Sequence, residues 1–211
     1  MNTPPVIRTN ALAESGVIAS AARVLRAGGL AVVPTDTVYG VAVRWGDARA
    51  LERLYQAKAR DARKPIPCLA SGLAAVRAAG VSPSAVEERL MVSLWPGPLT
   101  IVLAIGGGTR EGFRVPDHGL VCRLAAACGG VMRVTSANVS GEPPALDAAD
   151  AIRALGDSVD LVLDDGPSRG GVPSTVVRVD DGVIRVLRPG AITPAVLARV
   201  GRVPVVDGQD G

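Results

Sequence analysis

Aromatic residues make up only 2% of this 211-residue sequence, although hydrophobic residues as a whole make up 48%. A chain so rich in apolar residues has the composition of a folded protein and not of a disordered one. Its core must be built from Val, Leu, Ile and Ala, which suits strands that alternate with alanine-rich helices. The length allows one domain with a sizeable core.

Long apolar runs are also missing. No stretch approaches the roughly 18 to 20 apolar residues that a membrane-spanning helix needs. Residues 1–10 lack the apolar segment behind a basic flank that marks a signal peptide. We therefore expect no membrane association and a cytoplasmic location. The three cysteines, Cys68, Cys122 and Cys128, cannot all pair within the chain, and we interpret them as small buried side chains in a reducing compartment.

Histidine is almost absent, since His118 is the only one. A Ser-His-Asp triad would have to use it, and the chain has no Gly-x-Ser-x-Gly segment to present the serine. One histidine and three scattered cysteines also lack the close ligand pair that a zinc site needs. We expect a structural role for His118, and we assign no metal ligand among the side chains.

The net charge is only +3, so bulk charge does not indicate a non-specific coat for nucleic acid. Among 23 basic residues, however, only Lys58 and Lys64 are lysines. With Arg60 and Arg63 they place four cations within seven residues, offset by Asp61 alone. Because Arg binds phosphate through two N–H groups and Lys acts as a point charge, this cluster predicts a phosphate site. A solvated basic loop is the alternative.

Apolar runs and turn signals predict a single α/β domain with a mixed parallel and antiparallel sheet flanked by helices. Helices are expected at residues 11–27, 47–57, 72–79, 83–94, 117–128, 147–155 and after 193. Strands are expected at 30–33, 38–43, 66–70, 99–105, 131–135 and 159–163, with a hairpin of 174–179 and 183–187. Asp47 and Asp117 are the expected N-caps of their helices. The domain spans 1–211 with a core of about 12–200, and the last ten residues look loose.

Three polar segments border predicted strands: Pro34–Gly40, Thr135–Gly141 and Gly170–Thr175. Open α/β sheets bind ligands in loops at strand ends. Hydroxyl and backbone N–H groups at 135–141 suit a phosphate or a small amino acid, although an ordinary polar turn is the alternative. Neither a Walker pattern nor a Gly-x-Gly-x-x-Gly turn is present, so no common nucleotide motif applies.

Seven segments follow one another in order over about residues 15–195: Pro34-Thr-Asp-Thr-Val-Tyr-Gly40, Lys58-x-Arg60, Trp95-Pro-Gly-Pro-Leu-Thr100, Arg114-Val-Pro-Asp-His118, Thr135-Ser-Ala-Asn-Val-Ser-Gly141, Ser174-Thr-Val-Val177 and Arg188-Pro-Gly190. In these segments the chain resembles the YrdC-type threonylcarbamoyladenylate synthases. The resemblance implies the short, single-domain form, with a twisted mixed sheet and a positively charged concave cavity. The chain departs from many relatives at Lys64-Pro-Ile-Pro-Cys-Leu69, where a histidine is missing, and at Pro173, where relatives carry Glu.

The resemblance also implies an activity. That family joins L-threonine, bicarbonate or CO2, and ATP into threonylcarbamoyl-AMP, releases pyrophosphate, and supplies the donor for a tRNA modification next to the anticodon. Implied partners are Mg2+ on the phosphates and a downstream tRNA threonylcarbamoyl-transferase complex. The residues implied for ATP are Lys58, Arg60, Ser136, Asn138, Ser140 and Arg188, with Lys58 and Arg60 catalytic. Those implied for threonine are Thr35, Arg114, Thr135 and Ser174.

This chemistry needs no protein nucleophile, which agrees with the scarcity of histidine. The protein must align two anions against their repulsion and neutralise the charge that develops, a task for clustered Lys and Arg. Two alternatives stay open: a carbamoyl-AMP-forming relative, and a non-catalytic RNA-binding protein that uses the same basic cleft. The latter usually spreads cations along a surface among aromatics, and this chain has one Phe. Weak RNA binding by the enzyme also stays open.

Overall fold

The computed structural model of the chain describes residues 3–10 and 14–208. The strands of these residues form one 11-stranded sheet in the order β1-β8-β2-β3-β7-β4-β6-β5-β9-β10-β11. The strands are β1 (Val6–Arg8), β2 (Ala31–Val33), β3 (Gly40–Arg44), β4 (Cys68–Ala70), β5 (Leu99–Ile105), β6 (Thr109–Arg114), β7 (Val131–Ser136), β8 (Leu161–Asp164), β9 (Thr175–Asp180), β10 (Val183–Arg188) and β11 (Val205–Asp207). The helices are α1 (Glu14–Arg26), α2 (Ala48–Ala57), α3 (Leu73–Ala78), α4 (Ala85–Leu94), α5 (Gly119–Ala127), α6 (Ala148–Leu155) and α7 (Pro194–Gly201), with short 3-10 turns at Gly106–Gly108 and Gly156–Ser158.

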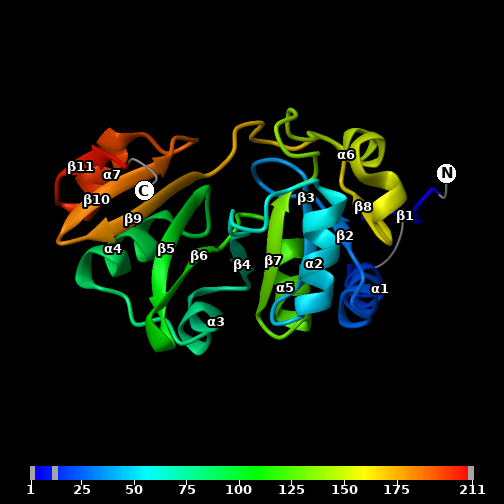
Figure 1. Ribbon diagram of the computed structural model, residues 1–211, viewed down its shortest axis with the longest axis horizontal. Coiled ribbons are helices and arrows are strands. Elements are labelled where there is room, and N and C mark those ends of the chain that lie inside the picture. Colours follow the sequence, from blue (N-terminus) through cyan, green and yellow to red (C-terminus); the bar gives the residue numbers. More distant parts are fainter. Residues whose placement is uncertain (1–2, 11–13, 209–211) are drawn as a thin grey trace.

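The sheet mixes both strand directions, as predicted. Antiparallel pairs such as β5–β6, β9–β10 and β2–β3 alternate with parallel pairs such as β1–β8, β4–β6 and β5–β9. The short strand β4 lies in the middle of Figure 1, between a half that contains β1, β8, β2, β3 and β7 and a half that contains β6, β5, β9, β10 and β11. It pairs through two residues with β6 and three with β7, so short ladders join the two halves there.

Helices cover both faces of the half that contains β7. Apolar residues of α1 and α5, among them Leu25 and Leu124, pack on one face, and those of α2 and α6, among them Leu54 and Leu155, pack on the other. A third cluster joins α4 and α7 to β5, β9 and β10. The core consists almost entirely of aliphatic side chains, as the composition predicts. Within the described ranges, none of the helices has the length and apolar character needed to cross a membrane.

Most predicted elements are confirmed within a few residues. Asp47 caps α2, because its Oδ1 accepts from the Ala50 N–H at 2.9 Å. The β9–β10 hairpin turns at Asp181 and Gly182, whose φ angles of 50° and 75° are those of the left-handed turn that such a hairpin favours. Residues 11–13 of the first predicted helix lie outside the described residues, and α1 begins at Glu14.

Several expectations are wrong. Asp117 does not cap α5: the N-cap is His118, and its side chain makes no capping bond. Val205–Asp207, placed in the loose tail, forms β11 in parallel with β10, and Gly208 N–H donates to Val186 O at 2.9 Å. At the other end, β1 pairs with β8 although it precedes the predicted core. Strand β6 had no counterpart among the predicted elements.

Candidate active site

Arg114 ends β6 and is buried, with only 5% of its surface exposed. Its Nε donates to Gly97 O at 3.0 Å, its Nη1 donates to Thr37 Oγ1 at 2.9 Å, and its Nη2 forms an ion pair with Asp36. These bonds use three of the five N–H donors of the guanidinium, and the other two have no partner among residues 3–10 and 14–208. Burial lowers the pKa of Arg114, and the Asp36 carboxylate opposes that effect.

The 34–39 loop is held in shape largely by the Thr35 hydroxyl. This hydroxyl donates to Val38 O at 2.6 Å and accepts from the N–H groups of Thr37 and Val38 at 3.1 and 3.3 Å. It therefore fixes the loop that presents Asp36 and Thr37 to the guanidinium. Because the Thr35 hydroxyl is engaged within its own loop, its contact with threonine stays a prediction.

The segment 165–174 runs across this loop. Ser168 Oγ and Gly171 N–H donate to Thr37 O at 2.6 and 2.8 Å. The backbones approach so closely that a Cβ on Gly170 would lie 2.5 Å from Asp36 O. Only glycine fits at position 170, since a side chain there would push the two segments apart. The segment ends at Ser174, another residue predicted to bind threonine.

Ser174 is buried beside β5 and β10. Its hydroxyl lies 2.9 Å from Thr100 Oγ1, and Arg188 Nη2 donates to Ser174 O at 2.7 Å and to Ser174 Oγ at 3.1 Å. Partial burial, followed by the like charges of Arg114 and Arg60, lowers the pKa of Arg188. Arg114 and Arg60 thus lie near enough to Arg188 to repel it. Such a cluster is stabilised by an anion placed among them.

Lys58 is buried to 1% exposure at the end of α2 and points toward the loop after β7. Its ammonium donates to Ser136 O at 2.5 Å, to Asn138 O, and to Asn138 Oδ1 at 3.4 Å. An ammonium has three N–H donors, so this loop occupies all of them. Burial, followed by the charge of Arg60, lowers the pKa of Lys58 to about 8. Contact between Lys58 and phosphate stays a prediction, and it requires the ammonium to exchange one of these oxygens.

The loop after β7 is fixed from several sides. Asn138 Nδ2 donates to Val139 O at 2.9 Å and to Glu142 O at 2.7 Å, and Ser140 N–H donates to Lys58 O at 2.9 Å. The predicted site residues Thr135 and Ser136 are half-buried at the end of β7, and Ser140 is exposed. The structure therefore joins the predicted Lys58 and Ser136–Ser140 segments into one unit.

Arg60 folds back over the basic loop, where its Nε and Nη2 donate to Lys64 O and Pro65 O, both at 3.1 Å. Arg63 is exposed and pairs with Asp61, so its charge is largely compensated. Of the four clustered cations, Lys58 is bonded to other predicted site residues, and Arg60 lies near enough to lower the pKa of Lys58 and Arg188. Phosphate binding by Arg60 stays a prediction.

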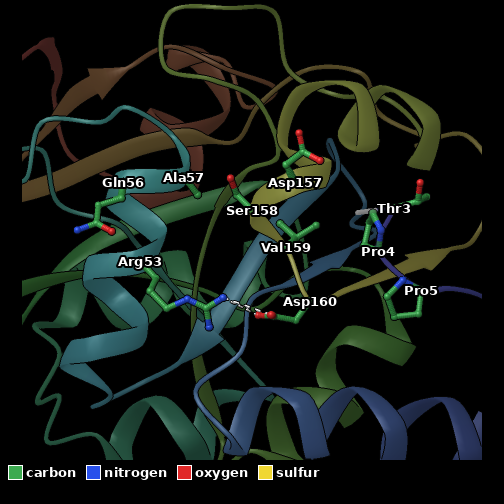
Figure 2. A pocket seen from close by; sticks show the side chains of 10 residues that line it. All are labelled: Thr3, Pro4, Pro5, Arg53, Gln56, Ala57, Asp157, Ser158, Val159 and Asp160. Carbon is green, nitrogen blue, oxygen red and sulfur yellow. Dashed lines mark hydrogen bonds and ion pairs between the residues drawn. The ribbon is translucent and has the colours of Figure 1, made fainter. Parts of the chain in front are cut away.

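Two surface hollows lie next to this region and not inside it. One, of about 510 Å³, lies between residues 3–5, α2 and residues 157–160 (Figure 2), and it contains no predicted site residue. Its Arg53 is paired with Asp160 at 3.0 Å. The other, of about 520 Å³, lies along α2 and the basic loop and is bordered by Arg60. We place the candidate site by the convergence of buried polar side chains and not by these hollows.

Sequence reasoning missed four groups that shape the site: Asp36 and Thr37 on Arg114, Thr100 on Ser174, and the carbonyl of Gly97. The motifs contained all four, but sequence pattern alone does not show which side chain in a motif turns inward. In the described residues, no group of three His, Cys, Asp or Glu side chains could hold a metal ion.

Comparison with known proteins identifies the family of the chain. The Sua5/YciO/YrdC family, described as telomere recombination, matches residues 23–190. A putative threonylcarbamoyl-AMP synthase of Mycobacterium tuberculosis (strain H37Rv) is 35% identical over 192 residues, which cover 87% of this chain and 88% of that protein.

Solved structures agree as well. Pyrococcus abyssi Sua5 complexed with L-threonine has a TM-score of 0.85 and 26% identity, covering 97% of this chain and 63% of that one. This chain therefore spans less than two thirds of that longer protein. Escherichia coli YciO has a TM-score of 0.78 and 25% identity, covering 90% of this chain and 96% of that one. By family match, sequence identity and fold, the chain belongs to the Sua5/YciO/YrdC family.

Proposed function

We propose that the protein joins L-threonine, bicarbonate or CO2, and ATP into L-threonylcarbamoyl-AMP with release of pyrophosphate. The observation that carries the proposal is the buried Arg114, which has two N–H donors without a partner among the described residues and lies near enough to Arg188 for its charge to lower the pKa of that residue. Arg188 lies near the like charges of Arg114 and Arg60 and is stabilised by an anion, and the substrates supply a carboxylate, a carbamate and phosphates. A relative named threonylcarbamoyl-AMP synthase and a Sua5 structure with L-threonine support the same activity.

The reaction proceeds in two steps. The threonine amine attacks CO2, or bicarbonate with loss of water, and forms a carbamate. A carbamate oxygen then attacks the α-phosphorus of ATP, and pyrophosphate leaves with the electron pair of the broken P–O bond. Because two anions must meet, positioning and positive charge supply most of the catalysis.

In this proposal Arg114 holds the threonine carboxylate, with Ser174, Thr135 and the 34–39 loop around the amino acid. Arg60 and Arg188 bind the ATP phosphates together with the loop Ser136–Ser140, which Lys58 holds in place. Mg2+ comes in with the phosphates, since it usually keeps several waters and few protein ligands. We further propose a cytoplasmic enzyme whose product is consumed by a tRNA threonylcarbamoyl-transferase.

The test is pyrophosphate release from ATP, measured with and without threonine and with and without bicarbonate, in the presence and absence of Mg2+. We expect release only when all three substrates and Mg2+ are present. Release with carbamoyl phosphate and no amino acid would instead indicate a carbamoyl-AMP-forming enzyme. No release under any condition, together with tight binding of RNA, would indicate a non-catalytic RNA-binding protein.

A further inference from the structure

The hydroxyl of Thr100 is a buried polar group to which the reaction gives no role. Thr100 lies on β5 and only 3% of its surface is exposed. Its methyl carbon faces β6, where a Cβ on Gly112 would lie 3.3 Å from Thr100 Cγ2. Its hydroxyl faces the other way, toward β9, and within the described part of the chain its hydrogen-bond partner is Ser174 Oγ, at 2.9 Å.

The direction of this bond follows from counting donors and acceptors. A hydroxyl has one hydrogen to donate and two lone pairs that accept. The 2.9 Å distance allows either hydroxyl to donate. If Ser174 donated to Thr100, the hydrogen of Thr100 would be left buried without an acceptor whether or not a ligand is bound. If Thr100 donates to Ser174, the unpaired hydrogen is that of Ser174, which a bound ligand can accept, so this direction is the one that satisfies both hydroxyls in the complex. Arg188 donates as well, because a guanidinium has donors only.

Both lone pairs of Ser174 Oγ are then occupied, by Thr100 and by Arg188. The remaining hydrogen-bonding capacity of this hydroxyl is its own O–H, which can only donate. Ser174 is itself buried, at 6% exposure, so that hydrogen also needs an acceptor. The ligand atom that meets Ser174 must be an oxygen that accepts, such as a carboxylate, carbamate or hydroxyl oxygen, and not an ammonium group.

We propose that Thr100 is a positioning residue that makes Ser174 an obligate hydrogen-bond donor to an oxygen atom of the amino-acid substrate. This inference rests on the proposed function for the identity of that substrate. The inference goes beyond the proposed function by assigning a role to Thr100 and a direction to the hydrogen bond at Ser174. The site thereby selects ligands with an accepting oxygen at Ser174, in addition to selecting them by shape.

The experiment measures the dissociation constant of L-threonine by calorimetry for the wild type, Thr100→Val, Thr100→Ala, Thr100→Ser and Ser174→Ala. A neutral hydrogen bond contributes about 0.5 to 1.5 kcal/mol, so Thr100→Val should weaken threonine about 2- to 12-fold. Thr100→Ala, which adds no bulk against Ser174, should change affinity in the same direction. Thr100→Ser should restore binding to within about twofold, because it keeps the donor.

A double-mutant cycle separates this role from a general loss of packing. In the Ser174→Ala background, Thr100→Val should weaken threonine no further, because its effect passes through Ser174. ATP affinity should not change in any of the three Thr100 variants. The matched control is Thr109→Val, the same substitution on the neighbouring strand β6, at an exposed residue.

Three results would overturn the inference. They are unchanged or tighter threonine binding in Thr100→Val and Thr100→Ala, additive effects in the cycle, or an equal loss of ATP affinity. Tighter binding would mean that Ser174 donates to Thr100 in the wild type and that the substitution frees its hydrogen. A wild type that binds no threonine at all would overturn the proposed substrate, and that result is distinct from the other three.

Discussion

Replacing Lys58 with methionine tests whether a buried ammonium holds the loop after β7. Methionine keeps an unbranched apolar stem but has neither charge nor N–H donors. In the wild type the ammonium is 1% exposed and spends its donors on Ser136 and Asn138. Its pKa is lowered from 10.5 to about 8, chiefly by burial and then by Arg60.

That lowered pKa links stability to pH. The unfolded chain binds the proton more tightly than the folded one, so the free energy of unfolding rises with pH between about 8 and 10.5. The stabilisation is fully present above 10.5 and is lost as the pH falls through about 8. At about 1.4 kcal/mol per pKa unit, the whole effect amounts to about 3 kcal/mol, of which about 2.5 is reached at pH 10.

The assay is urea unfolding of the wild type and Lys58→Met from pH 7 to pH 10, followed by tryptophan fluorescence and circular dichroism. Other titrating groups, including the three cysteines, are common to both proteins and cancel in the difference. We expect the wild type to gain about 2.5 kcal/mol relative to Lys58→Met over this range. A difference that does not change with pH would refute the reasoning, because it would mean that the ammonium is not desolvated in the folded protein.

Three further predictions concern catalysis. Alanine at Lys58 or Arg60 should lower the rate of pyrophosphate release roughly 10- to 150-fold, since a charge-assisted hydrogen bond contributes about 1.5 to 3 kcal/mol; folded variants with wild-type rates would remove both from the site. Arg114→Lys should raise the KM for threonine by a similar factor with little change for ATP, because Lys cannot reproduce a bidentate fork; the reverse pattern would assign Arg114 to the nucleotide. Release rates should fall in the order threonine, serine, valine, because valine leaves a buried polar group unpaired at about 1 to 3 kcal/mol, whereas serine loses one methyl at about 0.8 kcal/mol. Equal rates for valine and threonine would show that the hydroxyl is not recognised.

Local sequence signals predict an element correctly where a few adjacent residues form its cap or turn. The cap at Asp47 and the Asp-Asp-Gly turn of the hairpin are chemical features of a few adjacent residues, and both are found as predicted. Strands β1, β6 and β11 lack such signals. β1 and β11 have three residues each at the edges of the sheet, and β6 reads Thr-Arg-Glu-Gly-Phe-Arg without apolar alternation. Their strand structure comes from pairing with distant neighbours, which no local pattern reports.

In the candidate site, too, local sequence predicts some features, and others depend on residues that are distant in sequence. Motifs located the segments that meet, because glycine, proline and hydroxyl residues between apolar strands mark loops at strand ends. They did not reveal that the Thr35 hydroxyl turns into its own loop or that Lys58 spends all its donors on carbonyl and amide oxygens. Those choices depend on which acceptors the fold brings near, up to 80 residues away in sequence. The sequence therefore predicts the composition of the site better than its internal bonds.

The position of the short strand β4 has a consequence for the proposed threonine site. Its few backbone pairs join the half of the sheet that leads into the 136–140 loop to the half that carries Ser174, and the 165–174 segment adds a bond from Gly171 N–H to Thr37 O. Two ion pairs cross this junction, Arg114 with Asp36 and Arg133 with Glu111. These contacts hold the two halves in one arrangement across a short strand. The proposed threonine residues lie on both sides of β4, Thr35 and Thr135 on the side of β7 and Arg114 and Ser174 on the side of β6, so a threonine bound by all four would bridge the two halves of the sheet.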